Sequence, residues 1–297
     1  MKTTLERFST SDGIELHGVI HSPDKPTDVA VLQIHGMVGN FYKARFLDYL
    51  ALELTSTGYA FAAFNNRGCE YISNFLKTNR QDEESIRKGT AYERFEECTI
   101  DIRAAIDLLE KKGYRKIILS GHSMGCSKAV YYQAFSADNR IKALILISPT
   151  DMIDHARRQT NFAKLLSIAE QQIKEGKGDA MLPERFWGYY DLSAGTFANY
   201  FGKDTKLKIF NVLDKGESIL SNIELPILAV IGDMDRIVIK SPEEDMLSLK
   251  SLSTRCRSFD YRLIKGAAHS YFGHEMELAE IVGSWVEGVV KLKASLL

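Results

Sequence analysis

The chain has 297 residues, of which 45% are hydrophobic and 26% are charged, as is usual for a globular protein. A formal net charge of −1 gives no reason to expect nucleic acid or an anionic membrane as a partner. No segment reaches the roughly 18 uninterrupted apolar residues of a membrane span. The charged N-terminal segment lacks the apolar stretch of a signal peptide, and the four cysteines lack zinc or disulfide spacing. We therefore expect a cytoplasmic protein with free thiols and no membrane insertion.

Apolar, strand-like segments alternate with segments of helical periodicity along most of the chain. We predict strands at residues 14–20, 29–34, 59–65, 116–120, 141–148, 226–231 and 261–264. We predict helices at residues 41–57, 95–112 and 276–290 and directly after residue 123, with a polar loop at residues 66–92. Continuously apolar strands between amphipathic helices indicate a mostly parallel sheet covered on both faces, so the expected class is α/β.

The alternation stops between residues 149 and 224, where helical stretches occur without a convincing buried strand. Because strands resume afterwards, we interpret this segment as an insertion packed on the sheet and not as a second independent domain. The predicted organisation is a core of residues 1–148 and 225–297, with a helical insertion at residues 149–224. The alternative is a surface excursion without function, but loops this long in compact domains usually have one.

A glycine-rich turn follows the apolar run of residues 117–120. The motif Gly-His-Ser-Met-Gly at residues 121–125 stands where a strand ends and a helix begins. A serine at such a turn adopts a strained backbone, and small neighbours let the strand and the helix approach closely. The side chain of Ser123 would then emerge at the end of the sheet, which predicts a nucleophile. The alternative interpretation is an ordinary turn, because glycine and serine are common in turns.

A serine hydroxyl needs a base, and the base needs a group that orients it. In the chain order serine, acid, histidine, the candidate bases are His155, His269 and His274. We favour His269, because it follows the last predicted strand and leaves the sheet at the edge where Ser123 is expected. His274 is the second choice, and His155 lies in the insertion.

Two carboxylates follow the predicted strand at residues 226–231, in the sequence Gly-Asp-Met-Asp. Asp233 is next to the glycine and is suited to stabilise the turn. Asp235 has more freedom to reach the loop of His269, so we favour Asp235 as the acid, with Asp151 a distant third. Aspartate, serine and histidine all occur in ordinary turns at strand ends. Three of them in the required order, each after a buried strand, favour a catalytic triad.

An acyl-transfer site also needs N–H donors aimed at the developing oxyanion. The backbone amide of Met124 would lie at a helix N-terminus, where amides have no partner within the helix. The second donor is predicted in the loop after residues 29–34, which begins His35-Gly36-Met37. Gly36 permits close approach of the backbone, so the amide of Met37 is the candidate, and His35 is expected to have a structural role.

These motifs together resemble the α/β-hydrolase superfamily over residues 14–290. The resemblance rests on HG at residues 35–36, NNRG at 65–68, GHSMG at 121–125, GDMD at 232–235 and GAAHS at 266–270. It implies an eight-stranded, mostly parallel sheet with helices on both faces and a helical cap inserted after the sixth strand. Asn65 departs from the aspartate that is frequent at the first position of the Asp-x-Arg-Gly motif, which we expect to affect loop packing and not chemistry.

A narrower resemblance concerns GHSMGCSKAVYY, KEGKGDAMLP and DLSAGTF. These segments are similar to a hydrolase group that includes fungal siderophore esterases, which implies a bulky hydroxy-acid ester or depsipeptide substrate.

The insertion is rich in aromatic residues, and three of them are predicted to line a substrate pocket over the serine: Trp187, Tyr190 and Phe197. The alternative is that these rings attach the insertion to the core. Cys126 follows the glycine-serine turn and is expected to be a small core residue on a helix.

The predicted function is a serine carboxylesterase-type hydrolase of small-molecule esters, thioesters or lactones. It would act through Ser123, His269 and Asp235 with an acyl-enzyme intermediate, and it requires neither a metal nor an organic cofactor. One alternative is a carbon–carbon bond hydrolase that uses the same triad. Another is a non-catalytic ligand-binding receptor with the same fold. Nothing in the sequence predicts the oligomeric state.

Overall fold

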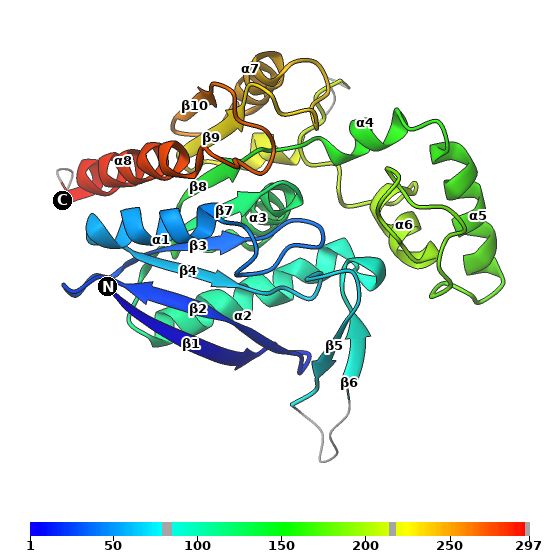
Figure 1. The fold of residues 1–297 in the computed structure, drawn as a ribbon, viewed down its shortest axis with the longest axis horizontal. Coiled ribbons are helices and arrows are strands. Elements are labelled where there is room, and N and C mark those ends of the chain that lie inside the picture. Colours follow the sequence, from blue (N-terminus) through cyan, green and yellow to red (C-terminus); the bar gives the residue numbers. More distant parts are fainter. Residues whose placement is uncertain (79–84, 214–217, 295–297) are drawn as a thin grey trace.

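A sheet of eight strands forms the centre of the protein (Figure 1). The computed structural model describes residues 1–78, 85–213 and 218–294. The strands of the sheet are β1 (Lys2–Ser9), β2 (Glu15–Ser22), β3 (Val29–Ile34), β4 (Ala60–Phe64), β7 (Lys116–His122), β8 (Ile141–Ile147), β9 (Ile227–Gly232) and β10 (Phe259–Ile264). Their order across the sheet is β1-β2-β4-β3-β7-β8-β9-β10.

The sheet is mostly parallel, as predicted. β1 pairs with β2, and β2 with β4, in antiparallel fashion, whereas every pair from β4 to β10 is parallel. Ile34 at the end of β3 is in register with Gly121 near the end of β7. The carboxyl ends of the central strands therefore meet at one edge, where open α/β sheets bind their ligands.

Helices cover both faces of the sheet. α1 (Phe46–Ser56) and α8 (Glu275–Ala294) lie against one face. α2 (Cys98–Lys111), α3 (Met124–Ser136) and α7 (Pro242–Leu252) contribute to the core on the other face. Successive residues of β3 alternate between the two cores, so Val31 packs with α1 while Leu32 packs with α2 and α3. This explains why the central strands are continuously apolar.

The segment between β8 and β9 is called the cap below. It follows the sixth strand of the sheet and contains α4 (Met152–Arg157), α5 (Phe162–Lys174), α6 (Ala194–Phe201) and the 3-10 helix η3 (Ile219–Asn222). Figure 1 shows α4, α5 and α6 to one side of the sheet. None of the described residues of the cap belongs to a strand of the central sheet.

The predicted secondary structure lacks α7 and differs from the observed one in three further places. β1 was not predicted, although its side chains alternate in exposure as an edge strand requires. The predicted helix at residues 41–57 begins only at Phe46, so residues 41–45 form a loop. The predicted polar loop at residues 66–92 contains a hairpin of β5 (Ser73–Leu76) and β6 (Ser85–Lys88), followed by the 3-10 helix η1 (Thr90–Tyr92). A second 3-10 helix, η2 (Phe95–Glu97), directly precedes α2.

Among the described residues, no helix has both the length and the apolar character needed to cross a bilayer.

Candidate active site

Ser123 occupies a sharp turn between β7 and α3. Its φ of 56° and ψ of −127° lie outside the regions that serine normally adopts, and its N–H donates to the Ile147 carbonyl at 3.0 Å. A Cβ atom on Gly121 would lie 2.3 Å from the Gly125 carbonyl oxygen, and one on Gly125 would lie 2.2 Å from the Ile34 carbonyl oxygen. Both positions therefore require glycine, and the turn presents the serine at the carboxyl end of the sheet.

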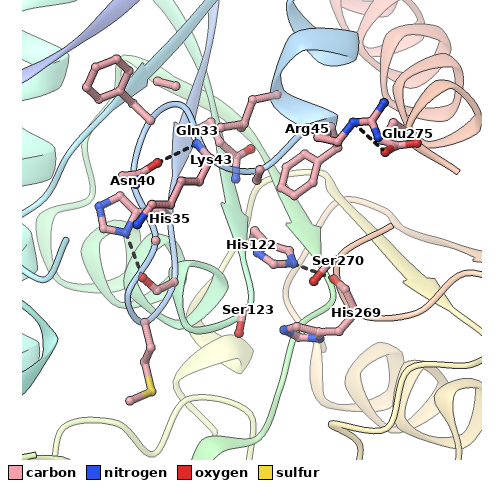
Figure 2. A pocket seen from close by; sticks show the side chains of 18 of the residues that line it. Gln33, His35, Asn40, Lys43, Arg45, His122, Ser123, His269, Ser270 and Glu275 are labelled. Atoms are coloured by element: carbon pink, nitrogen blue, oxygen red, sulfur yellow. Dashed lines mark hydrogen bonds and ion pairs between the residues drawn. The ribbon is translucent and has the colours of Figure 1, made fainter. Parts of the chain in front are cut away.

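His269 and Asp235 meet beside this turn. Nδ1 of His269 lies 2.8 Å from Oδ2 of Asp235, so this nitrogen carries the proton and donates to the carboxylate. When the ring is neutral, Nε2 is then the nitrogen with a free lone pair. Ser123 and His269 border the same pocket, and Figure 2 shows the His269 ring next to the Ser123 side chain. The three predicted triad residues are thus brought together.

The Asp235 carboxylate is buried and held in one orientation. Its Oδ1 accepts the Ile237 N–H at 2.9 Å, and the Ser148 hydroxyl is also hydrogen-bonded to it. Burial raises the pKa of Asp235, but the hydrogen bond and charge of His269, with the two other hydrogen bonds, outweigh burial, so the pKa is below its ordinary value. Asp235 is therefore ionised at neutral pH.

The alternative acids have other partners. Oδ1 of Asp233 accepts the Gly266 N–H at 2.7 Å, which ties the turn after β9 to the loop after β10 instead of stabilising the Gly232 turn alone. Asp151 is the N-cap residue of α4 and accepts the Val212 N–H at 2.7 Å, and burial raises its pKa to about 6.

The alternative bases also lie elsewhere. Nδ1 of His274 is 3.7 Å from the Glu277 carboxylate, in the first turns of α8. The ring of His155 packs on Trp187 in the cap, with ring centroids 5.1 Å apart.

His122 supports the loop that carries His269, a role that was not predicted from the sequence. Its Nε2–H donates to the carbonyl oxygen of His269 at 2.9 Å, and the two ring centroids are 4.9 Å apart. Burial, together with the nearby charge of His269, lowers the pKa of His122 to about 3, so this ring is neutral. Its place between Gly121 and Ser123 was the available signal, but the partner lies 147 positions away in the sequence.

Two further residues that the sequence did not predict lie next to Asp235. The hydroxyl groups of Ser148 and Tyr271 are 2.9 Å apart, and Tyr271 also donates to the Val230 carbonyl at 3.0 Å. Both residues are buried and have positive φ, of 49° and 56°. They tie the loops after β8, β9 and β10 together below the site.

The two predicted oxyanion donors lie on adjoining segments. A Cβ atom on Gly36 would come within 3.0 Å of the Ser123 Cβ atom and 3.2 Å of the Met124 nitrogen. The amides of Met37 and Met124 donate no hydrogen bond to any described residue. They are therefore free to receive an oxyanion.

The loop that carries Met37 is held from below by His35. Nδ1 of His35 donates to the Gly36 carbonyl at 2.8 Å, and Nε2 accepts the Asn66 N–H at 3.0 Å. Burial, with the nearby charge of Lys128, lowers the pKa of His35 to about 3. The ring is neutral and has the structural role that the sequence predicted.

A pocket of about 440 Å³ opens beside Ser123. Among its lining residues are Gln33, Met37, Asn40, Lys43, Arg45, Phe46, Ala63, His122, His269, Phe272 and Glu275, and Tyr190 contributes from the cap. Of the three aromatic residues predicted to line a pocket, Tyr190 does so. Trp187 and Phe197 are not in the pocket wall. Phe197 is fully buried among other aromatic rings of the cap, and Trp187 packs on Phe186 and Tyr190, as in the alternative interpretation.

Cys126 lies near the serine without bordering the pocket. It is fully buried, and its Sγ atom donates to the carbonyl groups of Gly121 and Ile147 at 3.1 and 3.2 Å. Burial raises the pKa of this thiol well above its ordinary value. Cys126 is therefore a core residue and not a second nucleophile. The described residues contain no cluster of three or more side chains arranged to hold a metal ion.

Comparison with known proteins agrees with this architecture. Residues 29–274 match the α/β hydrolase fold family, to which the chain therefore belongs. No curated protein matches the chain.

Solved structures share the fold over almost the whole chain. Est1E from Butyrivibrio proteoclasticus with ferulic acid bound is 19% identical, with 96% of this chain and 99% of Est1E covered and a TM-score of 0.66. DcsB in complex with its substrate analogue is 17% identical, with coverages of 97% and 99% and a TM-score of 0.70. The Pyrococcus furiosus esterase Pf2001 is 18% identical, with coverages of 98% and 91% and a TM-score of 0.61.

Proposed function

We propose that the protein is a serine hydrolase that cleaves carboxylic esters through Ser123, His269 and Asp235. The hydrogen bond between Nδ1 of His269 and Asp235 is the observation that carries the proposal. It orients the ring and leaves Nε2 as the basic nitrogen beside the pocket that Ser123 also borders. The name of Pf2001 as an esterase and the ferulic acid bound to Est1E support an ester substrate for this fold.

The reaction has two halves. Nε2 of His269 takes the Ser123 proton as Oγ attacks the ester carbonyl, and the amides of Met37 and Met124 stabilise the oxyanion. His269 then protonates the leaving alcohol, which leaves an acyl group on Ser123. In the second half His269 activates a water molecule, which releases the acid and regenerates Ser123. Asp235 stays ionised and stabilises the charged imidazole.

The proposal is tested by labelling with a fluorophosphonate, which phosphonylates an activated serine. We expect a covalent adduct on Ser123, to be mapped by mass spectrometry of the digested protein. Ser123→Ala is the matched control, because it removes the hydroxyl group and keeps the Cβ atom that the turn accommodates. Absence of an adduct on protein shown to be folded by circular dichroism refutes the proposal and favours a ligand-binding role.

The substrate class is tested on the same preparation. We expect hydrolysis of p-nitrophenyl esters, with thioesters and lactones as further substrates of the same acyl-enzyme chemistry. Cleavage of a β-diketone without any hydrolysis of these esters would instead favour a carbon–carbon bond hydrolase.

A further inference from the structure

The pocket beside Ser123 extends away from the cap. Part of its wall comes from the loop before α1, the first residues of α1 and the start of α8. We call this part the α1–α8 subsite and define it by Lys43, Ala44, Arg45, Leu47, Phe272 and Glu275. Figure 2 shows Arg45 and Glu275 near the top of the view, with Ser123 and His269 well below them.

Local hydrogen bonds hold the loop of this subsite in place. Oδ1 of Asn40 accepts the N–H groups of Tyr42 and Lys43, at 3.0 and 2.7 Å. Oδ1 of Asn65, the position that departs from the family motif, accepts the Phe41 N–H at 3.2 Å. The subsite is therefore largely preformed, as ligand pockets usually are.

Glu275 is the unusual feature of this wall. Its side chain borders the pocket but is only 5% exposed, and its Oε1 atom is buried and accepts no hydrogen bond from any described residue. The nearest cation is Arg45, whose Nε lies 3.7 Å from Oε1, beyond hydrogen-bonding distance. Buried carboxylates normally have hydrogen-bond partners, so a donor from a ligand would complete this one.

The charges around the subsite indicate what kind of donor fits. Lys43 and Arg45 are cationic, whereas Glu275 is the anionic side chain in the pocket wall. The two buried histidines of the wall, His35 and His122, are neutral because burial lowers the pKa of each to about 3. Lys43 is paired with Glu70 outside the wall, and Arg45 lies 3.7 Å from Glu275, so the charges around the subsite are balanced. A neutral hydroxyl donor keeps this balance, whereas an ammonium group would add a positive charge next to Arg45 and Lys43.

The rest of the subsite is apolar. Ala44, Leu47 and Phe272 contribute carbon surface, and Phe272 is stacked under the Arg45 guanidinium at 5.2 Å from its ring centroid. Such a wall fits a hydrocarbon chain or ring that carries a polar group at one point.

We propose that the α1–α8 subsite binds the half of the ester that bears a hydroxyl group, and that the Glu275 carboxylate accepts the hydrogen bond of that hydroxyl. The inference rests on the proposed ester hydrolase function and specifies its substrate class. Glu275 acts here as a specificity-determining residue and takes no part in proton transfer at Ser123.

The experiment compares esters in matched pairs. One series consists of p-nitrophenyl alkanoates of six to ten carbons, each with and without a terminal hydroxyl on the acyl chain. The other consists of acetate esters of alcohols of the same lengths, with and without a second hydroxyl. We expect kcat/KM to be higher for the hydroxylated member of at least one pair by about tenfold, as for a hydrogen bond to a charged acceptor. The gain should come from a lower KM.

Three variants assign the preference to Glu275. Glu275→Met removes the acceptor at similar size and should reduce the hydroxyl preference to about one. Glu275→Gln keeps a carbonyl acceptor without charge, and should retain part of the preference; it also serves if the methionine variant does not fold. Glu277→Met is the matched control, because Glu277 is also an acidic residue of the first turn of α8 but is exposed and outside the pocket wall. It should keep the full preference.

Two results would overturn the inference while ester hydrolysis itself persists. One is equal kcat/KM for both members of every pair. The other is an equal loss of preference in Glu275→Met and Glu277→Met, which would point to the charge of the helix terminus and not to a hydrogen bond. Failure of the wild-type protein to hydrolyse p-nitrophenyl acetate would instead refute the proposed function, and with it the inference.

Discussion

The loops at the strand ends and the junction between the cap and the core hold their polar side chains differently. In the loops, hydrogen bonds orient two histidine rings. His122 donates to the His269 backbone, and His269 donates to Asp235. At the junction, charges are buried. Lys128 of α3 and Glu93 are both 0% exposed and lie 2.5 Å apart, and Tyr200 of α6 donates to Glu93 at 2.6 Å.

The polar contacts of the two regions therefore have different roles: those in the loops orient side chains, and those at the junction attach the cap to the core. A hydrogen bond to a ring in an open pocket directs a reacting atom and adds little to stability. A buried charge without its partner costs much more free energy, wherever it lies relative to the chemistry. Substitution of the Asp235 carboxylate that orients His269 should therefore change mainly the rate of ester hydrolysis, whereas substitutions at the cap junction should change mainly the free energy of unfolding.

The largest expected effect is on the rate. Asp235→Asn should lower kcat/KM for p-nitrophenyl acetate by about 10³- to 10⁴-fold, because an amide no longer orients Nδ1–H or stabilises the imidazolium. Asp233→Asn is the matched control, since this carboxylate accepts the Gly266 N–H and not that of His269. Steady-state kinetics of both variants check the prediction. A greater loss of kcat/KM in Asp233→Asn than in Asp235→Asn would show that Asp233, and not Asp235, is the acid.

The next effect is on stability. Glu93→Gln leaves the Lys128 ammonium buried without its counter-charge, and should lower the free energy of unfolding by about 3–5 kcal/mol. Urea denaturation measures it. The control is Glu184→Gln in the exposed pair of Lys164 and Glu184 on the cap, which should cost less than about 1 kcal/mol. Similar values for both variants would contradict the distinction between buried and exposed pairs.

The third prediction is that the free energy of unfolding decreases at acidic pH because two buried histidines lie at the strand ends. His35 and His122 have pKa values of about 3 when folded, against 6.5 for the ordinary group, because burial disfavours the charged ring. The unfolded chain binds more protons between these values. Stability is therefore complete above pH 6.5 and decreases as the pH falls toward 3, by at most about 1.4 kcal/mol per pH unit for each ring.

Urea denaturation at several pH values between 7 and 4 tests this sign. His122→Asn should reduce the slope, whereas His17→Gln, at an exposed position, should leave it unchanged. An equal slope in wild type and His122→Asn would show that this ring is not buried in its neutral form.

The smallest expected effect is at the cap. Tyr200→Phe removes the hydroxyl that donates to Glu93 and should lower the free energy of unfolding by about 1.5 kcal/mol. kcat for p-nitrophenyl acetate should change little, because Tyr200 is fully buried away from the pocket. Tyr189→Phe, at a half-exposed position on the cap, is the control for stability. A large loss of kcat with unchanged stability would mean that the cap junction also orients the catalytic groups.

The fold class could be predicted because its signals are local. Phe95, Ile102, Ile106 and Leu109 recur at helical spacing within the predicted helix at residues 95–112, and all four are buried in one core. β1 and the β5–β6 hairpin were missed because an edge strand and a short hairpin bury little apolar surface, so their sequences are polar and resemble loops. The start of α1 was placed too early because residues 41–45 continue its apolar spacing, although Asn40 and Asn65 bind their N–H groups in a loop.

Much of the candidate site also follows from the order of residues along the chain. Backbone contacts next to Ser123 leave no room for a side chain at positions 121 and 125, so the two glycines of the motif are required by the turn itself. The preference for Asp235 over Asp233 followed from its distance from the turn, and the structure places Asp235 against His269. These inferences need only the chain direction and the parallel order of the strands.

Other features depend on residues that meet only in the folded chain. The hydrogen bond of His122 to the His269 backbone, the Ser148–Tyr271 pair and the Glu275 oxygen without a hydrogen bond each depend on how segments far apart in the sequence pack together. The pocket likewise extends toward α1 and α8, although the aromatic content of the cap had pointed to the insertion. Periodicity and turn chemistry act between near neighbours in the chain, whereas the partner of a buried polar group is set by how distant loops pack, which no local pattern encodes.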